Sequence, residues 1–249
     1  MVSRKDATTV SLEEKREKSD NLTLAVSGIT KSFGNNKVLR GVSFTAKSGD
    51  IIGLVGKSGC GKSTLLKILV GWHPADTGTV LMNGENITKD PLQLRRVVGY
   101  TTQDNSFYAK QTALENMRYY AGLYGVKDME RLDKLLKAVG LWDPRNTLSE
   151  RISGGMKRRL DFAISLVHEP KLLILDEPTA GLDPLLIEQF WGVVKKLGKD
   201  RIVIMSSHII SEIERYCGRA LILKDGAVAM ELSGKKLKGL EKEFRRAVA

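Results

Sequence analysis

A glycine-rich segment, GKSGCGKST at 56–64, holds residues whose types and spacing suit the binding of phosphate. Gly56, Gly61, Lys62 and Ser63 match the P-loop pattern G-x-x-x-x-G-K-[ST]. In this motif glycines let backbone N–H groups approach phosphate oxygens closely, the lysine reaches the β- and γ-phosphates, and the hydroxyl group coordinates Mg²⁺. The segment therefore predicts a site for ATP and Mg²⁺, and its other candidate nucleotide-binding residues are Lys57, Ser58, Gly59, Cys60 and Thr64.

Two adjacent carboxylates follow an apolar run, LLIL at 172–175. A P-loop enzyme needs a carboxylate to hold its Mg²⁺ ion, and Asp176 at the end of this run is the candidate. Glu177 follows directly and is predicted to act as the general base that polarises an attacking water. Taken alone, Asp176 and Glu177 are equally well explained as ordinary strand-end carboxylates. The P-loop in the same chain favours the catalytic interpretation.

The elements around the P-loop follow the order that this motif requires. The apolar segment at 51–56 is typical of a strand buried on both faces, and the segment at 63–72 has the pattern of a helix. Further strands at 96–103, 171–178 and 201–208 alternate with helices, which predicts an α/β core. The strands expected before residue 50 and in a closing hairpin that turns at Asp225-Gly226 are predicted to be antiparallel, as is a hairpin at 79–87.

Bulk composition limits the class of protein. With 249 residues, 42% of them hydrophobic and 28% charged, the chain is expected to form one globular domain or two subdomains. It has no apolar run long enough to cross a membrane, and its polar N-terminus is not expected to be a secretory signal. The two cysteines are expected to be free thiols in a reducing cytosol. A net charge of +11 suits a polyanion, an anionic membrane face or nucleotide phosphates.

The two ends of the chain differ in composition from its centre. Residues 1–20 form a polar tail, for which a short helix and disorder are both open. Residues 236–249 are predicted to form a basic amphipathic helix. Its apolar face would pack on the domain or, as the alternative, contact the inner face of a membrane.

Beyond these patterns, the segment ISGGM at 152–156 resembles the signature of the ABC ATPase superfamily, whose usual form is LSGGQ. A predicted helix separates it from LLILDEPTAGLD at 172–183, as in that family. The resemblance covers about residues 25–235 and implies an ATP-binding subunit of an ABC transporter. Ile152 and Met156 depart from the usual leucine and glutamine, and SGGMKRR is more similar to subunits of exporters than of importers.

The resemblance also implies the fold and its subdivision. It implies a P-loop NTPase (RecA-like) core with an antiparallel β subdomain and an α-helical subdomain that carries the signature. The ATPase domain is then expected at 21–235, with its helical subdomain at about 104–165.

The resemblance assigns further residues to the site. Phe33 would stack on adenine, with core packing as the alternative, and Gln103 would contact both Mg²⁺ and the attacking water. His208 would contact the γ-phosphate, although a histidine at a strand end is more often merely exposed. Asp183 would cross to a partner subunit. The signature residues would close over the γ-phosphate that a second subunit holds; they are Ser153, Gly154 and Gly155.

These implied roles predict an assembly. Two ATPase subunits would form a head-to-tail dimer around two ATP molecules, and a homodimer would have two competent sites. The helical subdomain and the Gln103 region would dock on an integral-membrane permease subunit. The chain is thus expected in the cytoplasm, held peripherally at the inner face of the cell membrane, without a nucleic-acid partner.

Two other classes compete with the transporter subunit. A soluble ABC ATPase would act in translation, DNA repair or iron–sulfur assembly, and only the iron–sulfur assembly type is a single domain of this size. A P-loop kinase or a RecA-like motor is disfavoured because SGG precedes LLILDEP in the chain.

Overall fold

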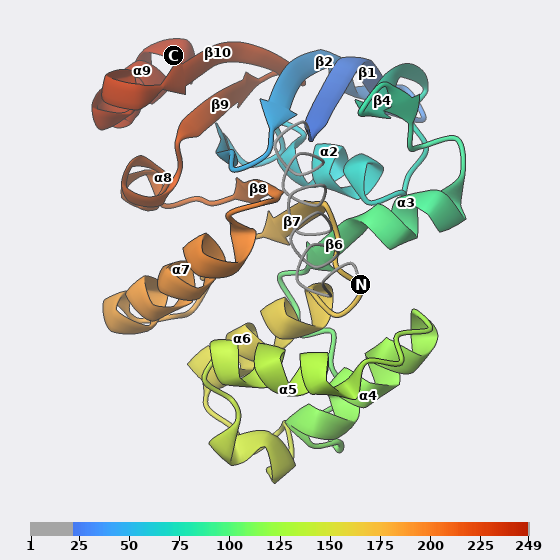
Figure 1. Ribbon diagram of the computed structural model, residues 1–249. Helices are drawn as coiled ribbons and strands as arrows, with labels where there is room; N and C mark the ends of the chain where they lie inside the picture. The colour runs from blue at the N-terminus through green and yellow to red at the C-terminus, as the bar shows by residue number, and fades with distance from the viewer. Residues whose placement is uncertain (1–21, 249) are drawn as a thin grey trace, which may run out of the picture.

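The computed structural model describes residues 22–248 and has two sheets with helices packed around them (Figure 1). The polar tail predicted at 1–20, with its open choice between helix and disorder, lies outside the described residues. Among residues 22–248, no helix combines the length and the apolar composition that a membrane crossing requires.

The larger sheet has six strands in the order β10-β9-β3-β8-β7-β6. Its neighbouring strands are parallel except for β9 and β10, which form the predicted closing hairpin. The central strands β7 and β8 are buried along their whole length and apolar except for their last residues, because both faces of the sheet are covered. The strands are β3 (Ile51–Gly56), β6 (Val98–Thr101), β7 (Leu172–Asp176), β8 (Ile202–Ser206), β9 (Arg219–Lys224) and β10 (Ala227–Ser233).

The smaller sheet has four antiparallel strands in the order β2-β1-β4-β5. Buried and exposed residues alternate along much of β1 and β2, as expected when only one face of a sheet is covered. The strands are β1 (Thr23–Phe33), β2 (Asn36–Lys47), β4 (Thr77–Met82) and β5 (Glu85–Asn86).

The helices divide between the two faces of the larger sheet. One apolar core joins the smaller sheet, α2 and one face of the larger sheet, and the other core joins the opposite face to the remaining long helices. In Figure 1, α4, α5 and α6 lie together at one end of the molecule, away from the smaller sheet. The helices are α2 (Lys62–Leu69), α3 (Pro91–Val97), α4 (Ala113–Leu123), α5 (Met129–Ala138), α6 (Gly154–Ser165), α7 (Pro184–Gly198), α8 (Ile210–Tyr216) and α9 (Leu240–Val248), with 3-10 turns at Asp143–Asn146 and Gly234–Gly239.

Two regions add detail that the sequence pattern does not give. The strand expected at 96–103 begins only at Val98, because Pro91–Val97 forms α3. Asp90 starts this helix by accepting a hydrogen bond from the Leu92 N–H at 2.8 Å, and Pro91 occupies its first turn. At the C-terminal end, Leu240 and Val248 of α9 are buried in the domain core, in line with the packing interpretation of this segment.

Candidate nucleotide-binding site

The P-loop connects the end of β3 to the start of α2, in the predicted strand–loop–helix order. Gly61 is the N-cap of α2 and has φ +104°, a left-handed conformation that favours glycine. A Cβ atom at Gly61 would lie 2.6 Å from Leu39 Cδ2. Both the backbone conformation and the available space therefore require glycine at this position.

Lys62 is a buried cation, with 6% of its surface exposed. Its ammonium group donates hydrogen bonds to the backbone carbonyl oxygens of Gly56 at 2.8 Å and Lys57 at 3.3 Å. These contacts compensate the burial of the charge and hold the side chain across the loop. The loop thus presents a fixed positive charge beside the N–H groups at the start of α2.

A cavity of about 260 Å³ opens over the P-loop and unites the central candidates of the site. Part of its wall comes from the loop and the start of α2, and the rest comes from the ends of β7 and β8 and from β2. Glu177 and His208 are the two wall residues that lie far from the P-loop in the sequence. The full wall is Val38, Ser58, Gly59, Gly61, Lys62, Ser63, Thr64, Glu177 and His208.

Glu177 and His208 meet directly at this cavity. The Nε2 atom of His208 lies 2.6 Å from Oε1 of Glu177. Glu177 has φ +49°, a conformation that is uncommon for a residue with a side chain and that often occurs at functional sites. Its backbone N–H donates to Ser206 Oγ at 3.0 Å, which fixes the turn after β7 to the end of β8.

Asp176 is held from two sides at the end of β7. Ser206 Oγ donates a hydrogen bond to Asp176 Oδ1 at 2.6 Å, and the Tyr100 hydroxyl lies 3.5 Å from Oδ2. Burial, and then the neighbouring charge of Asp176, raise the pKa of Tyr100 well above its ordinary value, so the phenol remains a donor. The sequence patterns did not indicate either partner. Ser206 could have been suspected from its position two residues before His208.

The signature residues lie at the start of α6. The Ser153 hydroxyl accepts a hydrogen bond from the Met156 N–H at 3.3 Å and so forms the helix N-cap. Gly155 faces α7, where an added Cβ atom would lie 2.8 Å from Leu186 Cδ2, whereas Gly154 faces open space. None of the three signature residues belongs to the wall of the phosphate cavity of the same chain.

Phe33, Gln103 and Asp183 also lie outside the wall of that cavity. Phe33 ends β1, is 46% exposed and meets the His73 ring edge-on at a centroid distance of 5.4 Å, so it is not a core residue. Gln103 is exposed in the loop after β6. Asp183 is the N-cap of α7 and accepts from the Leu186 N–H at 3.0 Å.

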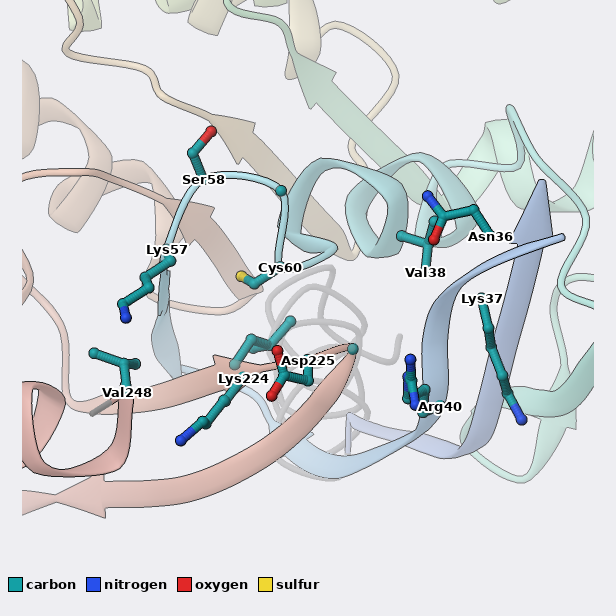
Figure 2. Close-up of a pocket in the computed structure, with 13 residues that line it drawn as sticks. Asn36, Lys37, Val38, Arg40, Lys57, Ser58, Cys60, Lys224, Asp225 and Val248 are labelled. Atoms are coloured by element: carbon teal, nitrogen blue, oxygen red, sulfur yellow. The ribbon is translucent and has the colours of Figure 1, made fainter. Parts of the chain in front are cut away.

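A larger cavity, of about 670 Å³, also opens beside the P-loop, next to the turn between β9 and β10 (Figure 2). Cys60 lines this cavity and not the phosphate cavity, and the same is true of Lys57. The Cys60 sulfur packs close to Gly56, where an added Cβ atom would also lie 2.7 Å from the Leu223 carbonyl oxygen. Both Cys60 and Cys217 are free thiols. The predicted nucleotide-binding residues of the loop are therefore divided between two cavities, with Ser58 and Gly59 on the walls of both.

Comparison with known proteins shows the family to which the chain is similar. The model of the family described as "ABC transporter" matches residues 39–180. The chain is 35% identical to the bacitracin transport ATP-binding protein BcrA of Bacillus licheniformis, over 87% of this chain and 71% of that protein. It is 34% identical to the Nod factor export ATP-binding protein I of Rhizobium sp. (strain N33), over 82% of this chain and 69% of that protein.

A solved structure gives the same result for the fold. The protein cbiO1 of Clostridium perfringens, part of the ABC transporter complex cbiONQ, superimposes with a TM-score of 0.81 at 27% identity. The match covers 91% of this chain and 94% of that one. The predicted α/β fold of a P-loop ATPase cassette is confirmed, and transport is favoured over the soluble iron–sulfur assembly alternative. On these grounds the chain belongs to the ABC transporter family, in which it is an ATP-binding subunit.

Proposed function

We propose that this chain hydrolyses ATP in a Mg²⁺-dependent reaction and that the resulting cycle of dimer closure and opening drives an ABC transporter. The observation that carries the proposal is the shared cavity of the P-loop, Glu177 and His208. It joins a phosphate cradle to a carboxylate–imidazole pair at 2.6 Å. The same residues supply binding, a proton acceptor and a polar contact for the terminal phosphate.

Each residue has a distinct task in the proposed reaction. The loop N–H groups and the Lys62 ammonium bind the β- and γ-phosphates and stabilise charge that develops on them. The Glu177 carboxylate accepts a proton from the water that attacks the γ-phosphate. His208 orients this carboxylate through its Nε2 contact and adds a polar group at the same end of the cavity.

The residues also fit a Mg²⁺ ion bound together with ATP. Ser63 lines the cavity, and Asp176 is buried at the adjacent strand end with one oxygen fixed by Ser206. Mg²⁺ usually takes one or two protein oxygens and completes its shell with phosphates and water, which suits this small donor set. When bound, the ion neutralises charge on the transferred phosphoryl group. Gln103, like Asp176, is not part of the cavity wall, and it is exposed in the loop after β6, from which it would reach the ion when ATP is bound.

The complete site is composite and needs two chains. Ser153, Gly154 and Gly155 stand at the start of α6 and are separate from the phosphate cavity of their own chain. A helix N-terminus with exposed N–H groups is a natural partner for a phosphate oxygen. In a head-to-tail homodimer, each signature would cover the ATP held by the other P-loop. Closure would then follow ATP binding, and hydrolysis would reverse it.

A third cavity supports docking of a membrane subunit. It has a volume of about 520 Å³ and lies between the core and the helical segment, next to the loop that carries Gln103. Trp72 and Leu123, which are 59% and 62% exposed, both line this cavity and give it an apolar surface that a partner could cover. An apolar helix of a permease would fit this groove and hold the chain at the cytoplasmic face of the membrane.

Export is the proposed direction of transport. The segment SGGMKRR is similar to exporter subunits, and the relatives named above serve bacitracin transport and Nod factor export. The permease subunit would select the molecule that is moved.

A Glu177→Gln variant tests the proposed reaction. Loss of the proton acceptor should lower ATP turnover by at least about 100-fold, while ATP binding persists. Size-exclusion chromatography with ATP and Mg²⁺ should show an accumulated dimer, because closure no longer ends in hydrolysis. The measurements are phosphate release and elution volume.

Two further variants complete this test. Glu188→Gln alters an exposed carboxylate on α7, 59% exposed and paired with Arg215, and should leave turnover unchanged. Lys62→Ala should abolish ATP binding itself. Near-normal turnover of Glu177→Gln would contradict the assignment of the base, and retained ATP binding by Lys62→Ala would contradict the role of the P-loop.

A further inference from the structure

The carboxyl group of Glu212 is buried behind the proposed catalytic pair and outside the phosphate cavity. It belongs to the first turn of α8 and is 4% exposed. Placing a carboxylate in the interior is costly unless its oxygens are hydrogen-bonded. The groups that satisfy Glu212 therefore determine how α8 is fixed to the rest of the site.

Three buried donors from three segments of the chain satisfy this carboxylate. Thr179 Oγ1 donates to Glu212 Oε1 at 2.6 Å, and Trp191 Nε1 donates to the same oxygen at 2.7 Å. Ser207 Oγ donates to Oε2 at 2.7 Å. Hydrogen bonds to an ionised group are stronger than bonds between neutral groups. None of the ion pairs found in residues 22–248 includes Glu212. The three hydrogen bonds therefore offset the cost of burying its carboxylate.

The first donor fixes the turn that carries Glu177. Thr179 lies two residues after Glu177, and the turn between them is closed by the Ala180 N–H, which donates to the Glu177 carbonyl at 3.2 Å. Glu177 has φ +49°, and such a conformation persists only when its surroundings hold it. The bond from Thr179 to Glu212 is one of the contacts that do so.

The Ser207 donor fixes the turn that carries His208. Ser207 immediately precedes His208, and its hydroxyl also accepts a hydrogen bond from the Ile209 N–H at 3.0 Å. The hydroxyl is thus held at both its donor and its acceptor side. The β7–β8 pairing ends at Asp176 and Ser206, so the strand ladder does not extend to the turns that follow. Glu212 joins those turns beyond the end of the ladder.

The Trp191 donor fixes the carboxylate itself to α7. Trp191 is fully buried and stacks on Tyr216 of α8 with a centroid distance of 5.1 Å and an interplanar angle of 11°. The two helices are therefore joined by ring packing as well as by the bond to Glu212. In Figure 1, α7 follows β7 and α8 follows β8, so each helix continues from one of the strands that carry the catalytic pair.

We propose that Glu212 is a positioning residue, which holds the Glu177 and His208 turns at the separation that brings Nε2 and Oε1 within 2.6 Å of each other. It acts through Thr179 and Ser207 and does not touch the nucleotide. The proposal rests on the proposed role of Glu177 as the base. A displacement of about 1 Å at a catalytic group lowers a rate by up to about 100-fold, which is the scale of effect expected here.

The test compares Glu212→Ala with Glu212→Gln. The alanine variant should lower kcat by about 10- to 100-fold, with the KM and the Kd for ATP changed by no more than about threefold, because the P-loop is untouched. Glutamine keeps one oxygen to accept from Thr179 and Trp191, and its amide can pair with Ser207. Glu212→Gln should therefore recover most of kcat.

Two further sets of variants separate positioning from loss of stability. Ile213→Ala removes a fully buried apolar side chain from the same helix and should lower stability with kcat nearly unchanged. Thr179→Val and Ser207→Ala each remove one donor and leave the carboxylate two, so they remain usable if Glu212→Ala does not fold. Each should lower kcat severalfold at nearly constant affinity for ATP.

The outcomes distinguish this proposal from the function on which it rests. If Glu177→Gln is inactive but Glu212→Ala, or the two donor variants, keep the kcat of Ile213→Ala, then Glu212 is merely structural and the positioning role is wrong. A glutamine variant as impaired as the alanine variant would equally contradict positioning by hydrogen bonds. If Glu177→Gln itself turns over normally, the proposed base is wrong, and the positioning role falls with it.

Discussion

At the scale of single residues, Asp161 is a buried carboxyl group that the proposed reaction does not use. Its Oδ1 atom accepts hydrogen bonds from the Ser106 N–H and hydroxyl, each at 2.8 Å, whereas Oδ2 has no hydrogen-bond partner among the described residues. Burial raises the pKa of Asp161 to about 6, although the Ser106 bonds and the charge of Arg158 act in the opposite direction. Asp161 thus joins α6 to the loop that carries Gln103, and its contribution to the free energy of unfolding depends on pH.

This residue gives a prediction about pH and stability. Because the pKa is raised in the folded state, Asp161 binds a proton more tightly there than in the unfolded chain. Its contribution to the free energy of unfolding is therefore most favourable at low pH and declines as pH rises from about 4 to about 6. The asparagine of an Asp161→Asn variant cannot titrate, so the stability of the variant relative to the natural chain should increase by on the order of 1 kcal/mol between pH 5 and pH 7.

Urea unfolding of both chains at pH 5, 6 and 7 measures this difference. Asp183→Asn is a suitable control, because Asp183 is an exposed N-cap and its oxygen can be replaced by the amide oxygen of asparagine. A difference between the natural chain and Asp161→Asn that stays constant over this range would contradict the raised pKa.

At the scale of elements, the two adjacent signature glycines have different physical requirements. Gly154 faces open space at the start of α6, but a Cβ atom at Gly155 would lie 2.8 Å from Leu186 Cδ2 of α7. Gly154→Ala should be neutral or stabilising by up to about 1 kcal/mol, because alanine is the better helix former. Gly155→Ala should lower the free energy of unfolding by about 1 to 3 kcal/mol through overpacking between α6 and α7.

Chemical denaturation of the two variants makes the comparison. The double variant Gly155→Ala with Leu186→Ala supplies the control, because removal of the leucine leaves room for the new methyl group. It should be less destabilised than the sum of the two single changes. Equal effects of Gly154→Ala and Gly155→Ala would show that contact with α7 does not distinguish the two positions.

Elements were predicted best where a local pattern determines them. The apolar strand β3, the P-loop and α2 follow one another in sequence, so pattern and spacing were enough. The sequence pattern does not predict α3, because the start signal from Asp90 and Pro91 belongs to a helix of only seven residues, Pro91 included. The polar contacts within the site join distant residues: Tyr100 lies 76 positions from Asp176, and Thr179 lies 33 positions from Glu212. No local pattern encodes such pairs, because folding alone brings them together.

At the scale of the whole molecule, the P-loop and the signature belong to different parts of the fold, so one chain presents only half of each proposed site. The P-loop, Glu177 and His208 follow the carboxyl ends of parallel strands in the larger sheet. Ligands commonly bind at these ends in α/β folds. The signature stands on α6, in the helical segment at the other end of the molecule (Figure 1). Because the signature residues are not part of the wall of the phosphate cavity, a second copy would supply the missing half in the proposed dimer.

A mixture of two inactive variants tests this arrangement directly. Lys62→Ala disables the P-loop of one chain, and Gly154→Asp adds a negative charge at the exposed start of α6 in the other, where it should repel phosphate without disturbing the fold. Half of randomly paired dimers are mixed, and each mixed dimer has one site with an intact P-loop and an intact signature. The mixture should therefore recover roughly a quarter of natural ATPase activity if the sites act independently, although each variant alone is nearly inactive.

The matched control replaces the signature variant by Glu177→Gln. Glu177 lies over the P-loop of its own chain, so a mixed dimer with Lys62→Ala has one site without the lysine and the other without the base. This pairing leaves no intact site and should recover nothing. Recovery with Gly154→Asp but not with Glu177→Gln would locate the signature in trans and the base in cis. Equal behaviour of both mixtures would contradict the composite site, because the distinction depends only on which chain covers which nucleotide.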